Sequence, residues 1–315
     1  MPESRLSQPL WSALALSYEC LQPPLRPSPD DLQFLESQLA DWAAEHPGRP
    51  LRALLLGVTP DLAGMRWPSG SSLVAVDSSM AMIRGVWPGN VPGRRRAVCA
   101  DWLAMPFRPQ SFDLVLGDGS INCVRYPASF HTLVSGVSRL LAPGGLLLLR
   151  CYVRPPAAPA PEQVIANAAH CASFSDLKLR LMMTLQESTE SGIAVDDVYR
   201  YWIRNRVDEA DLAARTGWDP RVIRSIENYR DSSTVHHFPT LDELHAIFCG
   251  SLDAVRISDQ PHPVIALRPK ANGRRAYAAA PAARKGARLS RRHAQRNSAE
   301  PPRREAPRFA RDPQQ

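Results

Sequence analysis

The chain is organised around residues 53–77, which read ALLLGVTPDLAGMRWPSGSSLVAVD. The run LLLG at 54–57 predicts a buried strand that ends on a glycine, and Thr59 followed by proline predicts that a helix begins directly afterwards. A second apolar strand follows and ends on Asp77. A β-α-β unit whose second strand ends on an acid is typical of nucleotide-binding sheets, in which the carboxylate binds ribose hydroxyls.

The composition of the 315-residue chain, 44% hydrophobic, supports one enlarged domain with a substantial core. The sequence has no run of about 18 apolar residues and no basic N-terminal segment followed by an apolar stretch, so we expect a soluble, cytoplasmic protein without a membrane partner. The six cysteines form no CxxC pair, and we expect reduced, mostly buried thiols. His236 and His237 lack partners at metal-ligand spacing, so we predict no metal site.

The net charge of +7 comes from the C-terminal end of the chain. Residues 271–315 contain twelve Lys or Arg and three Asp or Glu, a balance of +9, whereas residues 1–270 carry −2. Because the end is rich in Arg, Ala and Pro and poor in large apolar residues, we predict a disordered basic tail. We interpret it as a solubilising extension. The alternative is an electrostatic arm, and we expect nucleic-acid binding only through this tail.

Strands and helices alternate along the first half of the chain. After residues 53–77, apolar runs at 96–100, 112–116 and 146–152 predict further strands, and a 3.6-residue repeat within 127–141 predicts a helix. Such alternation requires parallel strands joined by right-handed crossovers, and ligands bind at the carboxyl ends of the strands in these sheets. Those ends carry Gly57, Asp77, Asp101, Trp102, Gly117 and Asp118.

The domain organisation follows from the segments on either side of this sheet. We predict an N-terminal cover segment and helix (1–48), a ligand-binding core (49–155), a helical lid (156–240), a last helix with a closing antiparallel hairpin (241–270) and the basic tail (271–315). The lid is expected to contain helices at 161–172, 175–186, 195–215 and 220–229.

Five motifs in order carry a resemblance to a known family. They are LLLG (54–57), VAVDSSMAMI (74–83), CADWLAMPF (99–107), FDLVLGDG (112–119) and RLLAPGGLLLLR (139–150). Their order and spacing resemble class I S-adenosylmethionine-dependent methyltransferases over about residues 50–155. The resemblance implies a Rossmann-like α/β fold, with a doubly wound, mostly parallel seven-stranded sheet and a helical lid insertion.

The resemblance also implies S-adenosylmethionine as the cofactor and roles for single residues. Asp77 matches the acid that binds ribose, and Asp101 matches the acid that pairs with the adenine amino group. Trp102, beside it, is either a cofactor contact or a core aromatic. The implied cofactor-binding set is Gly57, Thr59, Asp61, Asp77, Ser78, Met82, Asp101, Trp102 and Gly117. Asp118, at the mouth of the fourth strand, is the candidate general base, or else an acid of the Gly-Asp-Gly turn.

The first loop departs from the family pattern acid-x-Gly-x-Gly-x-Gly. Leu55 stands at the position of the acid, and Thr59 and Asp61 stand where the second and third glycines would be. Either the loop binds the methionine end of the cofactor through these two side chains, or cofactor binding has weakened or been lost. Because the acids at the ends of the second and third strands persist, retained binding is favoured.

The expected activity is transfer of the sulfonium methyl group to an O or N nucleophile of a small-molecule acceptor. Catalysis would depend on placing the nucleophile in line and excluding water, with optional proton removal by Asp118. The alternatives are a catalytically silent, methyltransferase-like binding or scaffold protein, and an RNA or protein methyltransferase that docks through the basic tail. The residues carry no signal for the acceptor or the oligomeric state.

Overall fold

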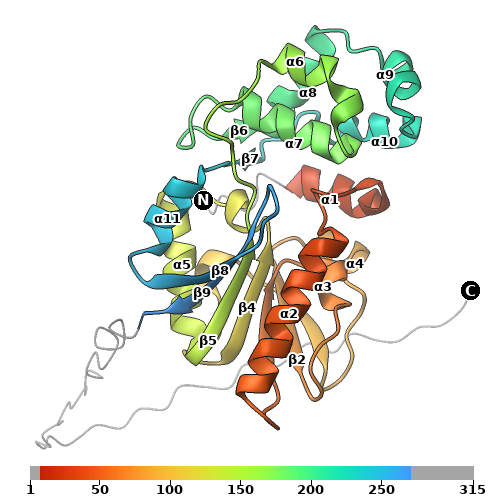
Figure 1. The fold of residues 1–315 in the computed structure, drawn as a ribbon. Helices are drawn as coiled ribbons and strands as arrows, with labels where there is room; N and C mark the ends of the chain where they lie inside the picture. The colour runs from red at the N-terminus through yellow and green to blue at the C-terminus, as the bar shows by residue number, and fades with distance from the viewer. Residues whose placement is uncertain (1–7, 271–315) are drawn as a thin grey trace, which may run out of the picture. The chain divides into compact units, whose positions relative to one another are not determined.

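The computed structural model describes residues 8–270 (Figure 1). Seven strands form one sheet in the order β3-β2-β1-β4-β5-β9-β8. The first five strands are parallel, and β9 lies antiparallel between β5 and β8. The predicted doubly wound, mostly parallel sheet is therefore confirmed. The strands are β1 (Arg52–Leu56), β2 (Ser72–Asp77), β3 (Arg95–Cys99), β4 (Phe112–Asp118), β5 (Leu141–Arg150), β8 (Leu252–Ile257) and β9 (Val264–Pro269).

Both faces of the sheet are covered by helices (Figure 1). Alternate residues of β1 therefore pack into two different cores: Ala53 and Leu55 into one, and Leu54 and Leu56 into the other. This explains why the strand is apolar from Ala53 to Leu56 rather than alternating with polar residues. The helices on the first face are α2 (Pro29–Glu45), α3 (Pro60–Ala63) and α4 (Met80–Gly85), and those on the second are α5 (Ala128–Leu140) and α11 (Leu241–Phe248).

Local capping sets where the helices of the first face begin. The Ser28 hydroxyl accepts from the Asp31 amide at 3.1 Å, and the Asp31 carboxylate accepts from the Ser28 amide at 2.9 Å, which closes the capping box of α2. The Ser79 hydroxyl accepts from the Met82 amide at the start of α4. Thr59 occupies the N-cap position of α3 as predicted, but its side chain makes no capping hydrogen bond. The Thr59 hydroxyl is therefore not used as a helix cap.

The insertion between β5 and α11 is helical, as predicted, and lies beyond the carboxyl ends of the parallel strands (Figure 1). Its helices are α6 (Pro161–Ala166), α7 (Phe174–Leu185), α8 (Val195–Arg204), α9 (Glu209–Thr216) and α10 (Pro220–Arg224), followed by the 3₁₀ helix η6 (Ser225–Tyr229). At the N-terminal end of the described chain, α1 (Gln8–Leu16) contacts α4 and η6. The N-terminal segment thus joins the sheet layer to the insertion.

The single helix predicted over residues 195–215 is wrong. The chain leaves α8 at Asn205, and Arg206 takes a positive φ of 48°. Asp208 then accepts hydrogen bonds from the amides of Ala210 and Asp211 and begins α9. Asn205 and Asp208, which bound the break, favour helix ends over helix interiors, so the cap at Asp208 is a local signal that the prediction of one helix overlooked.

A short strand pair in the insertion was not predicted. β6 (Ile193–Ala194) pairs antiparallel with β7 (Val235–His236). Two-residue strands carry no hydrophobic period, and their partners lie about forty residues apart in sequence. The pair brings the residues after Ser232 to the carboxyl ends of the main sheet, where they become part of the site described below.

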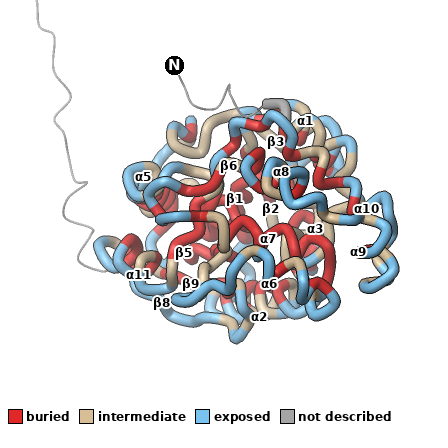
Figure 2. Tube along the Cα trace, turned by 90° about the horizontal axis from the view of Figure 1, so that it is seen from above, coloured by how far each residue is buried: buried red, intermediate tan, exposed pale blue. Residues whose placement is uncertain are grey.

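Burial follows the central strands, whereas the outer turns of the covering helices are exposed (Figure 2). Of the six cysteines only Cys151 is buried, and Cys99 and Cys249 are exposed, so the expectation of mostly buried thiols is wrong. All six are free thiols. Within residues 8–270 no helix is long and apolar enough to cross a membrane. The predicted basic tail, residues 271–315, lies outside the described residues.

Candidate functional site

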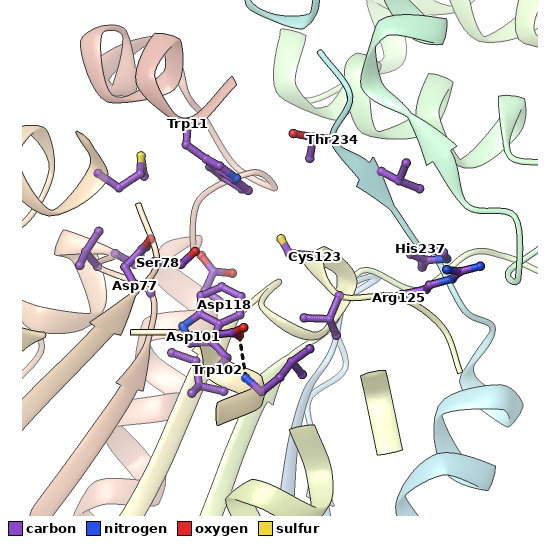
Figure 3. Close-up of a pocket in the computed structure, with 18 of the residues that line it drawn as sticks. Trp11, Asp77, Ser78, Asp101, Trp102, Asp118, Cys123, Arg125, Thr234 and His237 are labelled. Carbon is purple, nitrogen blue, oxygen red and sulfur yellow. Dashed lines mark hydrogen bonds between the residues drawn. The ribbon is translucent and has the colours of Figure 1, made fainter. Parts of the chain in front are cut away.

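A cavity of about 890 Å³ lies at the carboxyl ends of β1, β2 and β4 (Figure 3). Most of the residues that the sequence pointed to come together here. Those that line it are Gly57, Thr59, Asp77, Ser78, Met82, Asp101, Trp102 and Asp118. Two others do not line it, Asp61 and Gly117. The topology explains the gathering, because parallel strands deliver their carboxyl ends to one edge of the sheet.

Gly57 forms the floor of the cavity where β1 ends. Its φ is +103°, a conformation that favours glycine, and its amide donates to the Val76 carbonyl at 2.7 Å. The Trp102 indole nitrogen donates to the same carbonyl at 2.6 Å. A Cβ built on Gly57 would lie 3.9 Å from the Trp102 ring. The shared carbonyl therefore fixes the ring as a cavity wall beside the glycine.

Asp77 and Asp101 follow the ends of the neighbouring strands β2 and β3. One oxygen of Asp77 accepts from the Ser79 amide at 2.7 Å, and one oxygen of Asp101 accepts from the Leu103 amide at 2.9 Å (Figure 3). No cationic side chain in residues 8–270 pairs with either acid. Burial raises the pKa of Asp77 to about 6, opposed only by its amide hydrogen bond. Both carboxylates thus keep an oxygen for donors of a ligand.

Asp118 ends β4 and lies beside the cavity in a buried ion pair. The Arg150 Nε donates to its Oδ1 at 2.7 Å, and the side chains are 6% and 2% exposed. Arg150 also donates to the Pro24 carbonyl at 2.8 Å and the Tyr152 hydroxyl at 3.2 Å. Burial raises the pKa of Asp118 to about 6, although Arg150 opposes the shift. Asp118 is therefore a carboxylate at neutral pH.

Asp61 lies outside the cavity lining and has a different partner. Its carboxylate accepts two hydrogen bonds from Arg26, at 2.7 and 3.2 Å. The Arg26 guanidinium lies 5.0 Å from the centre of the Tyr18 ring, and Tyr18 lines the cavity. Asp61 thus reaches the cavity only through Arg26 and Tyr18.

Gly117 serves packing within β4 rather than the cavity surface. A Cβ built at this position would lie 2.2 Å from the Ser120 hydroxyl and 3.1 Å from a methyl group of Leu149. A larger residue would force the side chains of Ser120 and Leu149 to move. The glycine at this strand end is therefore explained by the close approach of the turn.

The sequence predicted an N-terminal cover segment but did not identify single residues in the remaining cavity walls. They come from the N-terminal segment, from the turn after β4 and from the insertion: Trp11, Tyr18, Cys123, Arg125, Glu190, Ser191, Ser233, Thr234 and His237 are among them (Figure 3). Only proximity in the fold joins these segments, so no local signal could have identified them. Within residues 8–270 no cluster of His, Cys, Asp and Glu is suited to a metal ion.

Cys123 is the thiol that lines the cavity. Burial, with the nearby Asp77 and Asp118 carboxylates, raises its pKa to about 12. A thiol with such a pKa is protonated at neutral pH and is a poor nucleophile. Cys123 therefore contributes to the wall without competing for an electrophilic group.

Asn122 joins three segments around the cavity. Its amide nitrogen donates to the Tyr152 carbonyl at 2.9 Å and the His237 carbonyl at 2.8 Å, and its amide oxygen accepts from the Tyr152 amide at 3.0 Å. The His237 amide donates to the Asn122 carbonyl at 2.9 Å. Asn122 is fully buried. It thereby fixes the insertion strand to the ends of β4 and β5.

Comparison with known proteins agrees with this geometry. Residues 58–149 match the family model described as a methyltransferase domain. No curated protein matches the sequence. The fold is similar to a structure described as a Zn-dependent alcohol dehydrogenase from Rhodobacter sphaeroides, at 13% identity, over 86% of this chain and 100% of that chain, with a TM-score of 0.51. At this identity the similarity concerns the fold alone.

Two further solved structures are methyltransferases. One is the 1,6-didemethyltoxoflavin-N1-methyltransferase of Burkholderia thailandensis with bound 1,6-didemethyltoxoflavin and S-adenosylhomocysteine (14% identity, 76% of this chain and 77% of that chain, TM-score 0.41). The other is the N-methyltransferase NodS of Bradyrhizobium japonicum with S-adenosylhomocysteine (12% identity, 82% and 98%, TM-score 0.40). Residues 58–149 thus match a methyltransferase domain, and the five ordered motifs and the order of the strands resemble the class I S-adenosylmethionine-dependent methyltransferases.

Proposed function

We propose that the chain transfers the methyl group of S-adenosylmethionine to an O or N nucleophile of a small-molecule acceptor. One observation carries this proposal. A single cavity holds three acids at the ends of three strands: Asp118, and Asp77 and Asp101, with which no cationic side chain of residues 8–270 pairs. Asp77 and Asp101 suit the ribose hydroxyls and the adenine amino group, which are hydrogen-bond donors.

The residues of this cavity fit the cofactor. The positive φ of Gly57 removes a side chain where backbone must approach the ligand closely, and the Asp77 carboxylate keeps an oxygen for the ribose. Of the two side chains that replace glycines in the first loop, Thr59 lines the cavity and Asp61 does not. Relative to the family pattern, the altered loop therefore adds one side chain to the cavity lining, that of Thr59, rather than two. When bound, the cofactor supplies an electrophilic methyl group.

The chain's own contribution is placement of the acceptor and exclusion of water. Trp11 from the N-terminal segment and Thr234 from the insertion cover the strand ends and limit access of solvent (Figure 3). Asp118 is unprotonated at neutral pH, and its carboxylate can accept a proton from the acceptor. A small-molecule acceptor suits a cavity that the chain encloses from several sides.

Calorimetric titration with S-adenosylmethionine and S-adenosylhomocysteine tests the proposal first. Binding of both is expected, and the variant Asp77→Asn should bind both more weakly. Asp211→Asn is the matched control, because Asp211 belongs to an exposed ion pair with Arg215 on α9. If neither ligand binds, the methyltransferase proposal is wrong and a silent scaffold role replaces it. Transfer of isotopically labelled methyl to a panel of small molecules then tests turnover.

Two further features of the proposal come from the sequence. A cytoplasmic location and contact with nucleic acid only through residues 271–315 stay predictions. Deletion of those residues should leave cofactor affinity unchanged. Loss of RNA binding on deletion, measured across salt concentrations, would instead favour an RNA methyltransferase that uses the tail for docking.

A further inference from the structure

A second, smaller cavity of about 140 Å³ adjoins the cofactor cavity. Six residues line both: Trp11, Tyr18, Thr59, Met82, Asp118 and Cys123. The two cavities therefore meet along these side chains. A group held in the smaller cavity lies next to the larger one, as an acceptor must lie next to the methyl group that it receives.

The rest of the smaller cavity is apolar and aromatic. Leu14 of α1, Leu179 and Met182 of α7, Tyr229 of η6 and Phe238 contribute to it, and all five are buried. These residues belong to the N-terminal segment and the insertion. A cavity with such a lining favours an apolar guest, because a polar group that enters without partners loses its hydration.

The smaller cavity offers no uncompensated charge. Among the lining residues that the structure describes, the one Asp, Glu, Lys or Arg is Asp118, to which the buried Arg150 donates at 2.7 Å. His236 also lines it, and burial lowers the pKa of this imidazole to about 4, so the ring is neutral at physiological pH. A charged acceptor group would be desolvated here without an opposite charge to offset the cost.

The volume limits the guest to about one ring. An engineered apolar cavity of about 150 Å³ holds a benzene molecule. We propose that the smaller cavity binds the acceptor, and that the acceptor is an uncharged, phenol-like molecule whose ring lies in this cavity with its hydroxyl toward Asp118. This inference rests on the proposed methyltransferase function. It adds the chemical class of the acceptor and the place where it binds.

The reaction balances with the groups present. The hydroxyl oxygen forms a bond to the methyl carbon as the carbon–sulfur bond breaks. The electron pair of that bond goes to sulfur, which loses its positive charge, and the hydroxyl proton passes to the Asp118 carboxylate. The products are a methyl ether and S-adenosylhomocysteine. Asp118 lies in the lining of both cavities, where this proton is released.

The first experiment measures binding of three ring probes to the full chain saturated with S-adenosylhomocysteine. The probes are phenol, benzoate and benzylamine, which are neutral, anionic and cationic at pH 7. We expect phenol to bind at least tenfold more tightly than either charged probe. Equal binding of the three, or no binding of phenol, would overturn the inference. Failure of S-adenosylhomocysteine itself to bind would instead reject the proposed function.

The second experiment fills the cavity from α7. Met182→Phe adds volume at a lining residue, and Met183→Phe is the matched control, since Met183 is its equally buried neighbour outside the lining. Neither residue lines the cofactor cavity. We expect the affinity of Met182→Phe for phenol to fall at least tenfold and its affinity for S-adenosylhomocysteine to stay unchanged. The control variant should keep both affinities.

A variant on a different helix provides an independent test in case Met182→Phe does not fold. Leu14→Phe on α1 also narrows the smaller cavity without touching the cofactor cavity, and thermal melts identify which variants are folded. A folded lining variant that binds phenol as well as the unaltered chain would overturn the inference. So would a control variant that loses phenol binding as strongly as the lining variants.

Discussion

The Arg150 guanidinium and the Asp118 carboxylate form a buried ion pair at the carboxyl ends of the neighbouring strands β5 and β4. Because Arg150 also donates to the Pro24 carbonyl, the pair ties the N-terminal segment to the sheet. Removing Asp118 leaves the buried Arg150 with only the longer contact to the Asp31 carboxylate, at 3.7 Å, to offset its charge. We therefore expect Asp118→Leu to lower the free energy of unfolding by about 3–5 kcal/mol.

The double variant Asp118→Leu with Arg150→Met should recover part of that loss, since it removes both charges of the pair and leaves Asp31 with its hydrogen bonds to Ser28. A double-mutant cycle by urea unfolding measures the coupling. Additive effects of the two single variants would show that the pair is not coupled. The cycle also allows a loss of methyl transfer in Asp118 variants to be separated from a loss of folding.

Asp77 should determine cofactor affinity. Asp77→Ala removes the hydrogen bonds that the ribose hydroxyls donate to the Asp77 carboxylate. We therefore expect binding of S-adenosylmethionine to weaken by about 1–3 kcal/mol. Calorimetry on the folded variant measures the change. Unchanged affinity in a folded protein would remove the ribose assignment from Asp77.

The raised pKa of Asp77 predicts a pH dependence with a definite sign. Between its ordinary value of 3.8 and about 6, the folded protein holds a proton that the unfolded chain has released. The contribution of this group to stability is therefore complete below pH 3.8 and is lost as the pH rises through about 6. Between pH 4 and 7, the free energy of unfolding measured with urea should decline less in Asp77→Asn than in the unaltered protein. The contribution of Asp118 to this pH dependence should be the same in both proteins.

Cofactor binding should follow the opposite trend. The ribose hydroxyls donate to the ionised carboxylate, so affinity for S-adenosylhomocysteine should rise as the pH increases through about 6. The same titration with Asp77→Asn is the control, and its affinity should change less over this range. A rise of the same size in the variant would assign the pH dependence to another group.

Asp61→Asn should weaken S-adenosylmethionine and S-adenosylhomocysteine equally. Asp61 contacts Arg26 rather than the cavity, so it acts through the position of Tyr18 and not on the sulfonium charge that distinguishes the two ligands. Parallel calorimetric titrations give the ratio of the two affinities. A larger loss for S-adenosylmethionine would show that this carboxylate reaches the sulfonium group in solution.

Lys178 of α7 is a buried cation whose replacement should stabilise the protein. It is 1% exposed, its ammonium donates to the Ser225 hydroxyl at 3.1 Å, and it lies 5.2 and 5.3 Å from the ring centres of Phe174 and Tyr229. No carboxylate in residues 8–270 pairs with it. Burial lowers its pKa to about 8. We expect Lys178→Met to raise the free energy of unfolding at pH 7 by about 1–3 kcal/mol.

The pH dependence of the free energy of unfolding of Lys178→Met provides a second test. In the unaltered protein the folded state releases the Lys178 proton near pH 8, whereas the unfolded chain keeps it until about 10.5. Lys178 therefore makes stability rise with pH over this interval, and Lys178→Met should lack that rise. A destabilised variant at pH 7 would show that the ammonium–ring contacts outweigh the desolvation of the charge.

The sequence predicted the sheet because its strands are defined locally. Apolar runs at 54–57 and 112–116 are buried on both faces, and such runs identify central parallel strands without knowledge of their neighbours. Asp77 and Asp101 were found from their places at the ends of predicted strands, since Asp77 is the last residue of β2 and Asp101 lies two residues beyond β3. Their presence in one cavity then follows from parallel pairing alone.

The rest of the site depends on contacts between segments far apart in the chain. Asp61 was assigned to the cofactor because it stands at a glycine position of the family's first loop. Its partner Arg26 lies 35 residues away, and no pattern in the sequence connects the two. His237 was considered only as a metal ligand, yet the β6–β7 pair places it in the cavity wall. The break between α8 and α9, by contrast, has a local signal, because Asp208 is a typical capping residue and begins α9.

The two cavities draw on different parts of the chain. The strand ends Gly57, Asp77 and Asp101 line only the larger one, whereas most residues that line only the smaller one belong to the N-terminal segment or the insertion. Substitutions in those two peripheral segments can therefore alter which acceptor is accepted without disturbing the nucleotide contacts. Related chains that share this sheet would be free to diverge in substrate preference while their dependence on the same methyl donor stays constant.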